Sequence, residues 1–283
     1  MQRIITPEVR IRRALKLLIL YVILIAIAMT MVGPFLWMVS TAIKPGAEAY
    51  VYPPRIMPNE LSIENIQEVM SIIPIFRYLL NTGYLSIVGT LLQLIVASMA
   101  AYAFARLEFP GRDAIFFMFL GTMMIPGAVT MIPTFILMRL FGWMDSYNAL
   151  IIPGLGSAFG TFLLRQFFLT IPNELEDAAR IDGAGRMRFY LTILLPLSVP
   201  ALITLGIFSF LGRWNSFMWP LLVIRTKDKF PIQLGLAMFR SEWTQSTHLM
   251  MTATTISVIP LLIVFIVAQK HFVQGVVLSG FKG

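Results

Sequence analysis

Six long apolar stretches dominate this sequence and constrain what it can fold into. They lie at approximately 14–39, 79–105, 114–141, 150–169, 197–224 and 249–267. A helix that crosses a bilayer needs about 20 mostly apolar residues, and each stretch has about that length. With 58% hydrophobic and only 13% charged residues, the chain has too little polar surface for a water-soluble fold. The sequence therefore predicts an all-α membrane protein with six transmembrane helices in a single transmembrane domain over residues 1–283.

Basic residues in alternate connections predict the orientation of the spans. Thirteen of the 22 Lys and Arg residues fall in the N-terminal arm, in the connections around Arg106 and Arg180, and in the C-terminal tail, whereas eight fall in the other connections. Cytoplasmic loops carry the excess of positive charge, so the first group is predicted to be cytoplasmic. Six spans then place both termini in the cytoplasm. The net charge of +8 thus reflects topology and does not indicate a nucleic-acid partner.

The long connection on the outer side, from Thr41 to Tyr78, ends in an amphipathic stretch at 63–73. Its period predicts a short helix along the membrane interface, with Glu60, Glu64 and Glu68 toward water. We interpret this stretch as a cover on the helix bundle rather than as a ligand site.

Prolines interrupt the predicted spans, at Pro126, Pro133, Pro153, Pro200, Pro220 and Pro260. Each removes a backbone donor and bends a helix, which lipid tolerates only where neighbouring helices or a water-filled cavity satisfy the freed carbonyls. Broken helices favour a pathway through the protein, although proline is common in transmembrane helices in general.

The sequence carries few groups that could perform chemistry. It has no Gly-rich loop ending in Gly-Lys-Ser/Thr, no His-Glu-x-x-His and no cysteine, and its two histidines, His248 and His271, are far apart. We therefore predict no catalytic residue, no metal site and no cofactor bound by this chain. Ionisable groups inside the spans are scarce, which disfavours both an intramembrane enzyme and an ion-coupled secondary carrier. The energy source is expected on another chain.

The most polar group in a span is Arg213 with Trp214 and Asn215. An aromatic face can stack on a sugar ring and an amide can bond its hydroxyl groups, so Trp214, Asn215 and Asn81 are candidates for a substrate path. The favoured alternative is an aromatic belt at the outer interface, with Arg213 extended toward water.

The segment 171–196, between the fourth and fifth spans, differs from the rest of the chain. Asn173 followed by Glu176 is a capping-box-like start, and a short helix is predicted over 174–181. Asp182-Gly183 is predicted to form a turn in which Asp182 caps the next helix. Small and apolar residues beside four acids are typical of a helix that docks into a cleft of a partner, and an ordinary amphipathic connector is the alternative.

This segment resembles the EAA motif of the permease subunits of binding-protein-dependent ABC importers. The residues that carry the resemblance are Asp177-Ala178-Ala179, Gly183 and Ile193-Leu194-Leu195-Pro196. Asp177 departs from the usual Glu but keeps its charge. Other sequences, over almost the whole chain, resemble the carbohydrate subgroup of the maltose or glycerol-phosphate type, and its smaller permease in particular: Ala101-Tyr102-Ala103, Phe109-Pro110-Gly111-Arg112, Met124-Ile125-Pro126, Trp214-Asn215 and Phe272-Val273-Gln274-Gly275.

The resemblance implies a type I ABC importer permease fold in a bacterial or archaeal plasma (inner) membrane. The implied partners are a second homologous permease, two copies of a cytoplasmic ABC ATPase that bind ATP and Mg²⁺, and an extracytoplasmic solute-binding protein that delivers a carbohydrate. ATP-driven closure of the ATPases would then shift the permease between inward-open and outward-open states. This chain would form half of the pathway and would not itself be an enzyme.

The resemblance also implies which residues couple the chain to the ATPase: Glu176, Asp177, Ala178, Ala179, Asp182 and Gly183. Asp177 is expected to contact the ATPase by charge, Ala178 and Ala179 to fill its groove, and Gly183 to allow the turn. The cargo stays open among mono-, di- and oligosaccharides, polyols and glycerol phosphate.

Overall fold

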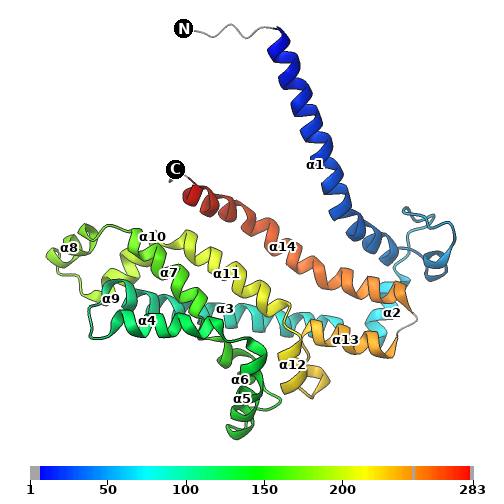
Figure 1. Ribbon diagram of the computed structural model, residues 1–283. Coiled ribbons are helices and arrows are strands. Elements are labelled where there is room, and N and C mark those ends of the chain that lie inside the picture. Colours follow the sequence, from blue (N-terminus) through cyan, green and yellow to red (C-terminus); the bar gives the residue numbers. More distant parts are fainter. Residues whose placement is uncertain (1–6, 244–245, 281–283) are drawn as a thin grey trace. The chain divides into compact units, whose positions relative to one another are not determined.

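The computed structural model describes residues 7–243 and 246–280, with side chains for 12–243, 246–267 and 269. Arg3 and Lys282, which the topology prediction counts, lie outside the described residues, and the side chains of the resembling run 272–275 are not among those described. The described residues form helices and no strand (Figure 1), which confirms the all-α class. They divide into two compact units, and a single working domain over 1–283 stays a prediction.

Unit one comprises Met1–Ile72 and Trp243–Ile256. It contains α1 (Pro7–Ala42), η1 (Gly46–Tyr50), α2 (Glu64–Ile72) and the start of α14 (Thr247–Gly280). Helix α2 is the predicted amphipathic helix, because Glu64 and Glu68 are exposed while Asn65 and Val69 are buried. The Asn65 amide fixes α2 to the end of α1 by donating to the carbonyls of Thr41 and Lys44, at 3.2 and 2.8 Å.

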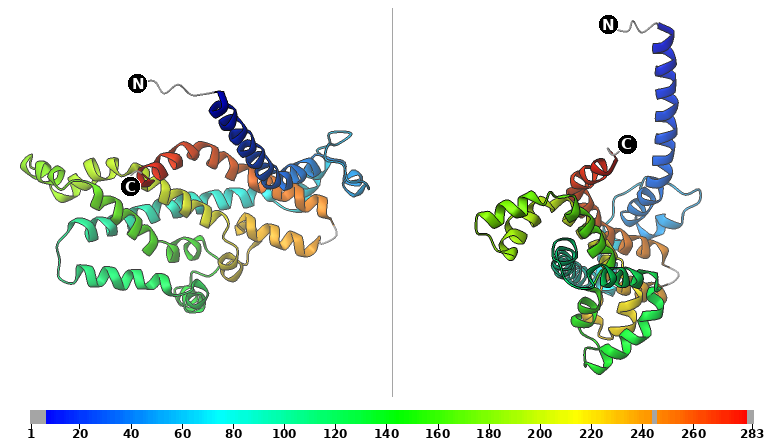
Figure 2. Two further views of the ribbon diagram at one scale, coloured as in Figure 1. Left: turned by 45° about the horizontal axis from the view of Figure 1, so that its top comes forward. Right: turned by 60° about the vertical axis from the view of Figure 1, so that its left-hand side comes forward.

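Unit two comprises Ile73–Glu242 and Ser257–Gly283, and α3 (Ile75–Arg106) lies at its centre. Helix α3 packs along α7 (Ala158–Thr170) and α11 (Val199–Trp214), as Figure 2 shows. Small residues on α3 permit this close approach. The core that they form includes Ala97, Ala101, Leu164, Phe168, Ala201 and Leu205.

Three of the apolar segments of unit two are broken by sharp bends. Helix α4 (Arg112–Gly121) with η2 (Thr122–Met124) meets α5 (Gly127–Leu140) at 101°. Helix α6 (Tyr147–Ile151) with η3 (Ile152–Gly154) meets α7 at 44°. The run of α9 (Arg186–Phe189), η4 (Tyr190–Leu194) and α10 (Leu195–Leu197) meets α11 at 77°.

The bends fall where the sequence predicts interrupted helices. Pro126 caps α5, Pro153 lies in η3 and Pro200 lies in the first turn of α11. Segments of α1, α3 and α14 are each long and apolar enough to cross a membrane unbroken. With the three bent pairs counted as one span each, the described residues provide up to six spans by length and composition.

The predicted fifth span, 197–224, is not one continuous helix in the structure. Helix α11 ends at Trp214, because the chain turns at Asn215 and Ser216 before the separate short helix α12 (Met218–Val223). The unit continues through η5 (Lys227–Lys229) and α13 (Ile232–Glu242). Arg213 therefore lies in the last turn of a helix, not in the middle of one.

Asp145, in the connection from α5 to α6, binds the connection that follows α12. Its carboxylate accepts the backbone N–H groups of Arg225 and Thr226 at 2.9 and 3.0 Å, the Thr226 hydroxyl at 2.6 Å and Lys229 Nζ at 3.2 Å. Partial burial raises the pKa of Asp145, but the hydrogen bonds from Thr226, Arg225 and Lys229 outweigh it and hold the pKa well below 3.8. Both connections are predicted to lie outside, so this contact agrees with the predicted alternation of sides.

Candidate functional site

Helix α8 (Glu174–Ile181) begins and ends at the residues predicted for the coupling helix. Its inner face carries Glu176 and Ala179, which are 7% and 5% exposed. Ala179 packs in the core with Phe189 of α9, and Glu176 forms an ion pair with Arg180 at 3.0 Å. The Ala179 side chain thus packs against the chain's own core, and the expectation that it fills a partner's groove stays a prediction. Glu176 and Ala179 are three positions apart and therefore lie on the same face of α8, which is turned toward the chain's own core.

The outer face of α8 carries Leu175, Asp177, Ala178 and Ile181, all of them exposed. Ile181 is 87% exposed, an unusual position for a large apolar side chain at the end of a short acidic helix. Leu175 and Ala178 are three residues apart and lie on one side of the helix. The structure therefore presents a small apolar strip bordered by acids. The small and apolar residues for which the sequence favours docking include Leu175, Ala178 and Ile181, and the family resemblance adds Asp177.

The predicted capping box at the start of α8 is wrong. Asn173 already has helical backbone angles, φ −69° and ψ −27°, and its side chain caps no backbone N–H. Its Oδ1 instead accepts a hydrogen bond from Arg106 Nη1. Arg106 Nη2 also donates to the carbonyls of Phe168 and Ile171, at 2.8 and 2.5 Å, so this arginine ties the end of α3 to the entry of the segment.

The predicted turn after α8 is present, and Gly183 forms it with a left-handed φ of +77°, which glycine adopts without strain. Its N–H donates to the Arg180 carbonyl at 3.0 Å. The prediction that Asp182 caps the next helix is wrong, because α9 begins after Gly185 and has no side-chain cap. Asp182 is exposed beside the turn.

Two tyrosines connect the segment to α3. The Tyr102 hydroxyl donates to the Arg186 carbonyl at 3.2 Å, and the hydroxyls of Ser98 and Tyr190 lie 2.7 Å apart. The two tyrosine rings pack with their centroids 5.1 Å apart. Displacement of α9 would therefore pull directly on α3. Sequence reasoning missed this link, and the only available signal was two tyrosines among apolar residues of facing segments.

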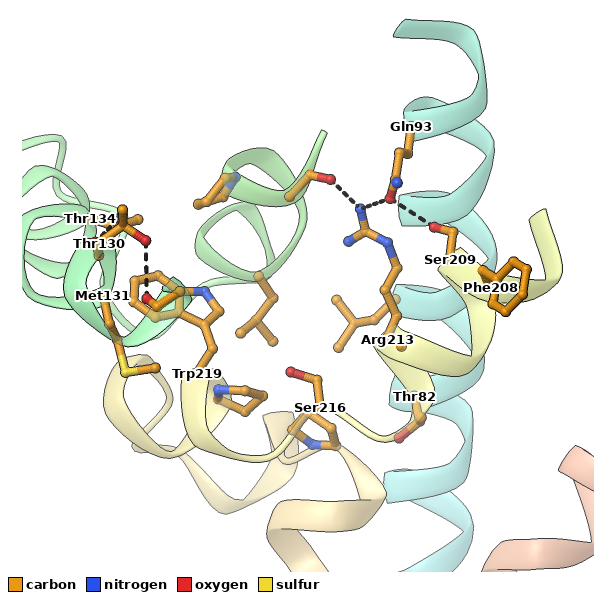
Figure 3. Close-up of a pocket in the computed structure, with 18 residues that line it drawn as sticks. Thr82, Gln93, Thr130, Met131, Thr134, Phe208, Ser209, Arg213, Ser216 and Trp219 are labelled. Atoms are coloured by element: carbon orange, nitrogen blue, oxygen red, sulfur yellow. Dashed lines mark hydrogen bonds between the residues drawn. The ribbon is translucent and has the colours of Figure 1, made fainter. Parts of the chain in front are cut away.

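A second candidate site is a partly open cavity of about 480 Å³ lined by elements of unit two (Figure 3). Its walls are mostly apolar, with a few hydroxyl, amide and guanidinium groups, the pattern typical of a small-molecule site. The polar and aromatic lining residues are Thr82, Gln93, Thr130, Thr134, Phe208, Ser209, Arg213, Ser216 and Trp219.

Arg213 turns into the bundle, so its interpretation as a side chain extended to water is wrong. Its Nη2 donates to Gln93 Oε1 at 3.1 Å and to the Gly154 carbonyl at 2.9 Å (Figure 3). Gln93 Oε1 also accepts from Ser209 at 2.8 Å. The Gly154 carbonyl lies at the break between η3 and α7, where the helix cannot satisfy it, so the guanidinium supplies the donor that the broken helix lacks.

Asn81 lies outside this cavity lining, and its side chain makes three hydrogen bonds that connect parts of the fold. Its Nδ2 donates to the carbonyls of Asp228 and Phe230, at 2.8 and 3.0 Å, and its Oδ1 accepts the Tyr147 hydroxyl at 2.8 Å. It thereby joins α3 to the connection before α13.

Trp214 and Asn215 also lie outside the cavity lining. Trp214 is 4% exposed and stacks on Phe210 at a centroid distance of 5.6 Å, while Asn215 is exposed and donates to the Leu211 carbonyl at 3.0 Å. The aromatic residues that line the cavity are Phe208 and Trp219 instead. A role in the substrate path for Asn81, Trp214 or Asn215 stays a prediction.

Within the part of the chain that the structure describes, no group of three or more His, Cys, Asp or Glu residues could hold a metal ion. The two candidate sites are helix α8, with its exposed apolar strip, and a mostly neutral cavity with one cation in its lining.

Comparison with known proteins decides the family. A family model for the inner membrane component of binding-protein-dependent transport systems matches residues 93–278. The chain belongs to this family. The matched range contains α8 and most of the cavity-lining residues.

Two relatives and one solved structure are similar to this chain over most of its length. The arabinooligosaccharides transport system permease protein AraQ of Halalkalibacterium halodurans is 32% identical and covers 91% of this chain and 93% of its own. The sn-glycerol-3-phosphate transport system permease protein UgpE of Escherichia coli is 35% identical, covering 81% and 85%. A bacterial ABC transporter involved in the import of the acidic polysaccharide alginate matches with a TM-score of 0.81 and 25% identity, covering 94% and 98%.

These matches confirm the predicted family and the type I permease fold. The chain is a multi-pass permease component of a transport system that works with a binding protein.

Proposed function

We propose that this chain is a permease subunit of an ATP-driven carbohydrate importer and forms half of its translocation pathway. The cargo class rests on the relatives, which are named for arabinooligosaccharides, glycerol phosphate and alginate. The proposed partners are a second homologous permease, two ATPase subunits that bind ATP and Mg²⁺, and a solute-binding protein that delivers the carbohydrate. The chain itself carries no proposed catalytic or cofactor role.

The observation that carries this proposal is the outer face of α8. Leu175, Ala178 and Ile181 expose apolar surface on a helix that is otherwise acidic, and the small Ala178 allows a partner's backbone to approach closely. Exposed apolar residues grouped at one place on a surface mark an interaction site. We assign this face to a groove of the ATPase, with Asp177 and Asp182 at its edge. Glu176 and Ala179 then hold α8 on the permease from the inside.

The contacts behind α8 supply a route for the motion. Arg106, Tyr102 and Ser98 tie the coupling segment to α3, which packs against α7 and α11 around the cavity. ATP-driven closure of the ATPases would move α8, and the attached helices would shift between inward-open and outward-open arrangements. The proposal places α8 and both termini in the cytoplasm of a bacterial or archaeal cell, as the basic residues predict.

A variant with a bulky side chain on the outer face tests this assignment. Ala178→Trp should lower binding-protein-stimulated ATP hydrolysis and ATP-driven uptake by about 5-fold or more, because overpacking a close interface costs about 1–3 kcal/mol. Ala178→Ser, which keeps the side chain small, is the matched control and should retain both activities. The measurement uses the complete importer reconstituted in proteoliposomes, with membrane insertion checked separately.

Two results would contradict the proposal. Stimulated ATP hydrolysis in Ala178→Trp at the level of Ala178→Ser would mean that α8 does not dock on the ATPase. Accumulation of sugar by the single chain alone under a proton or sodium gradient would make it a secondary carrier.

A further inference from the structure

The cavity in unit two contains a cation without a counter-ion. Arg213 is the one charged side chain in its lining, and among the described residues no ion pair involves it. A neutral sugar could be bound by hydroxyl and amide groups alone. A charged side chain within a membrane-spanning bundle is costly, and such residues mark substrate or ion pathways. The lone guanidinium therefore needs an explanation beyond binding a neutral sugar.

The guanidinium is held in position by neutral groups. Beyond the bonds from Nη2 to Gln93 and Gly154, it lies against the backbone of Gly89 on α3, where an added Cβ would come within 2.5 Å of Nη1. The absence of a side chain at Gly89 is what lets the group sit there. Carbonyl and amide dipoles orient the guanidinium but leave its net charge uncompensated.

Part of the guanidinium still has donor capacity. Its described hydrogen bonds all start from Nη2, and Nε is buried without an acceptor. A planar guanidinium with free donors suits a carboxylate or a phosphate, both of which accept charge-assisted hydrogen bonds from arginine. An anion entering the cavity would give Nη1, which has no described hydrogen bond, an acceptor and would supply the missing charge.

We propose that Arg213 is an anion-binding residue of the translocation cavity and that the cargo is an acidic carbohydrate carrying a carboxylate or a phosphate. This inference rests on the proposed function as a carbohydrate importer. An acid of the second permease could instead pair with Arg213 as a structural bridge between subunits, and the test separates that possibility.

The test measures binding by calorimetry to the assembled importer in lipid nanodiscs, without its binding protein. One pair of probes is digalacturonate and its neutral methyl ester, and the other is glycerol 3-phosphate and glycerol. Wild type should bind the acidic member of at least one pair about 10-fold or more tightly than the neutral member, and the pair that shows it identifies carboxylate or phosphate. Arg213→Gln should abolish this preference, and Arg213→Lys should keep part of it.

Arg139→Gln is the matched control, because it removes the same charge from an exposed position on α5 outside the cavity lining, and it should keep the full preference. Equal binding of acidic and neutral probes by wild type, or a preference that survives in Arg213→Gln, overturns the inference. A third result also overturns it: wild type shows no preference for the acidic probes, and the Arg213→Gln importer dissociates into subunits. That result would assign Arg213 to a structural bridge between the two permease subunits. ATP-driven, binding-protein-dependent uptake of a neutral sugar would in each of these cases leave the proposed function standing.

Discussion

At the scale of single residues, Asp145 is the clearest case of one side chain joining two distant parts of the chain. Its carboxylate accepts four hydrogen bonds from the connection after α12, and its own backbone adopts φ +55°, unusual for a residue other than glycine. No other residue type offers a short side chain with two charged acceptor oxygens at this position. The residue therefore secures the predicted outer end of unit two.

Asp145→Asn should lower the free energy of unfolding at pH 7 by about 1–3 kcal/mol, because an amide replaces an ionised acceptor. The pKa of Asp145 is lowered in the folded state, so the stabilisation is fully present above the unfolded value of 3.8 and is lost as the pH falls below it. The difference between wild type and variant should thus be constant around neutral pH and shrink below pH 3.8.

Thermal unfolding in detergent at a series of pH values measures this difference. Asp228→Asn is the control, because it removes a charge from the same connection but none of the four bonds, and it should have little effect. A constant difference between wild type and Asp145→Asn down to the lowest pH would show that the carboxylate charge is not what stabilises the connection.

At the same scale, the sequence indicates which polar side chains are unusual, but it does not indicate which groups they bind. Arg213 was recognised as unusual, yet its direction depends on the space beside Gly89 and on the unpaired carbonyl of Gly154, which belong to two other elements. The same holds for Asn81, whose three hydrogen bonds reach residues 66 to 149 positions away in the sequence. Such partners are set by tertiary packing and have no local pattern.

At the scale of elements, the turn between α8 and α9 depends on backbone conformation alone. Gly183→Ala should destabilise it by about 1–2 kcal/mol, because an L-residue is strained at φ +77°. Gly185→Ala is a matched control, since Gly185 has φ −72° and neither glycine has another atom within 4 Å of an added Cβ.

Hydrogen exchange of the α8 amides measures the effect of the two glycine variants. Gly183→Ala should speed exchange by about 5- to 30-fold, the factor that corresponds to 1–2 kcal/mol, while Gly185→Ala should leave it nearly unchanged. Equal exchange in the two variants would mean that the left-handed turn is not required for α8 to fold.

The bounds of α8 could be predicted because the sequence signals for them are local. Its capping interactions could not be predicted in the same way. Asn173 and Glu176 have the spacing of a capping box, but Arg106 on α3 takes the Asn173 oxygen and Arg180 takes the Glu176 carboxylate. Two arginines, one on α3 and one a turn further along α8 itself, thus bind the side chains that a capping box would use. The predicted length of the fifth span was wrong because hydropathy does not detect the turn at Asn215 within a continuous apolar run.

At the scale of the whole molecule, the orientation in the membrane is open to a direct test because the chain contains no cysteine. Single cysteines at Asp182 and Lys227, both exposed, should report opposite sides. In intact cells a membrane-impermeant thiol reagent should label Lys227→Cys, and it should label Asp182→Cys only after lysis.

The unmodified cysteine-free chain is the blank for this labelling. Labelling of Asp182→Cys in intact cells would reverse the predicted orientation, and labelling of both variants would contradict the alternation of sides. The alternation itself was predictable from basic residues and hydropathy, since lipid imposes both on any spanning chain.

The break between η3 and α7 also has a mechanical consequence. Helix α7 has 13 residues, and only a short connection separates its end from α8. A rod of that length is about 20 Å, so pivoting it by about 10° at the break would carry its far end through roughly 3.5 Å. A small angular change beside Gly154 thus becomes a displacement comparable to a side chain where α8 begins. With this geometry, a small movement at the cavity would accompany a much larger movement at α8.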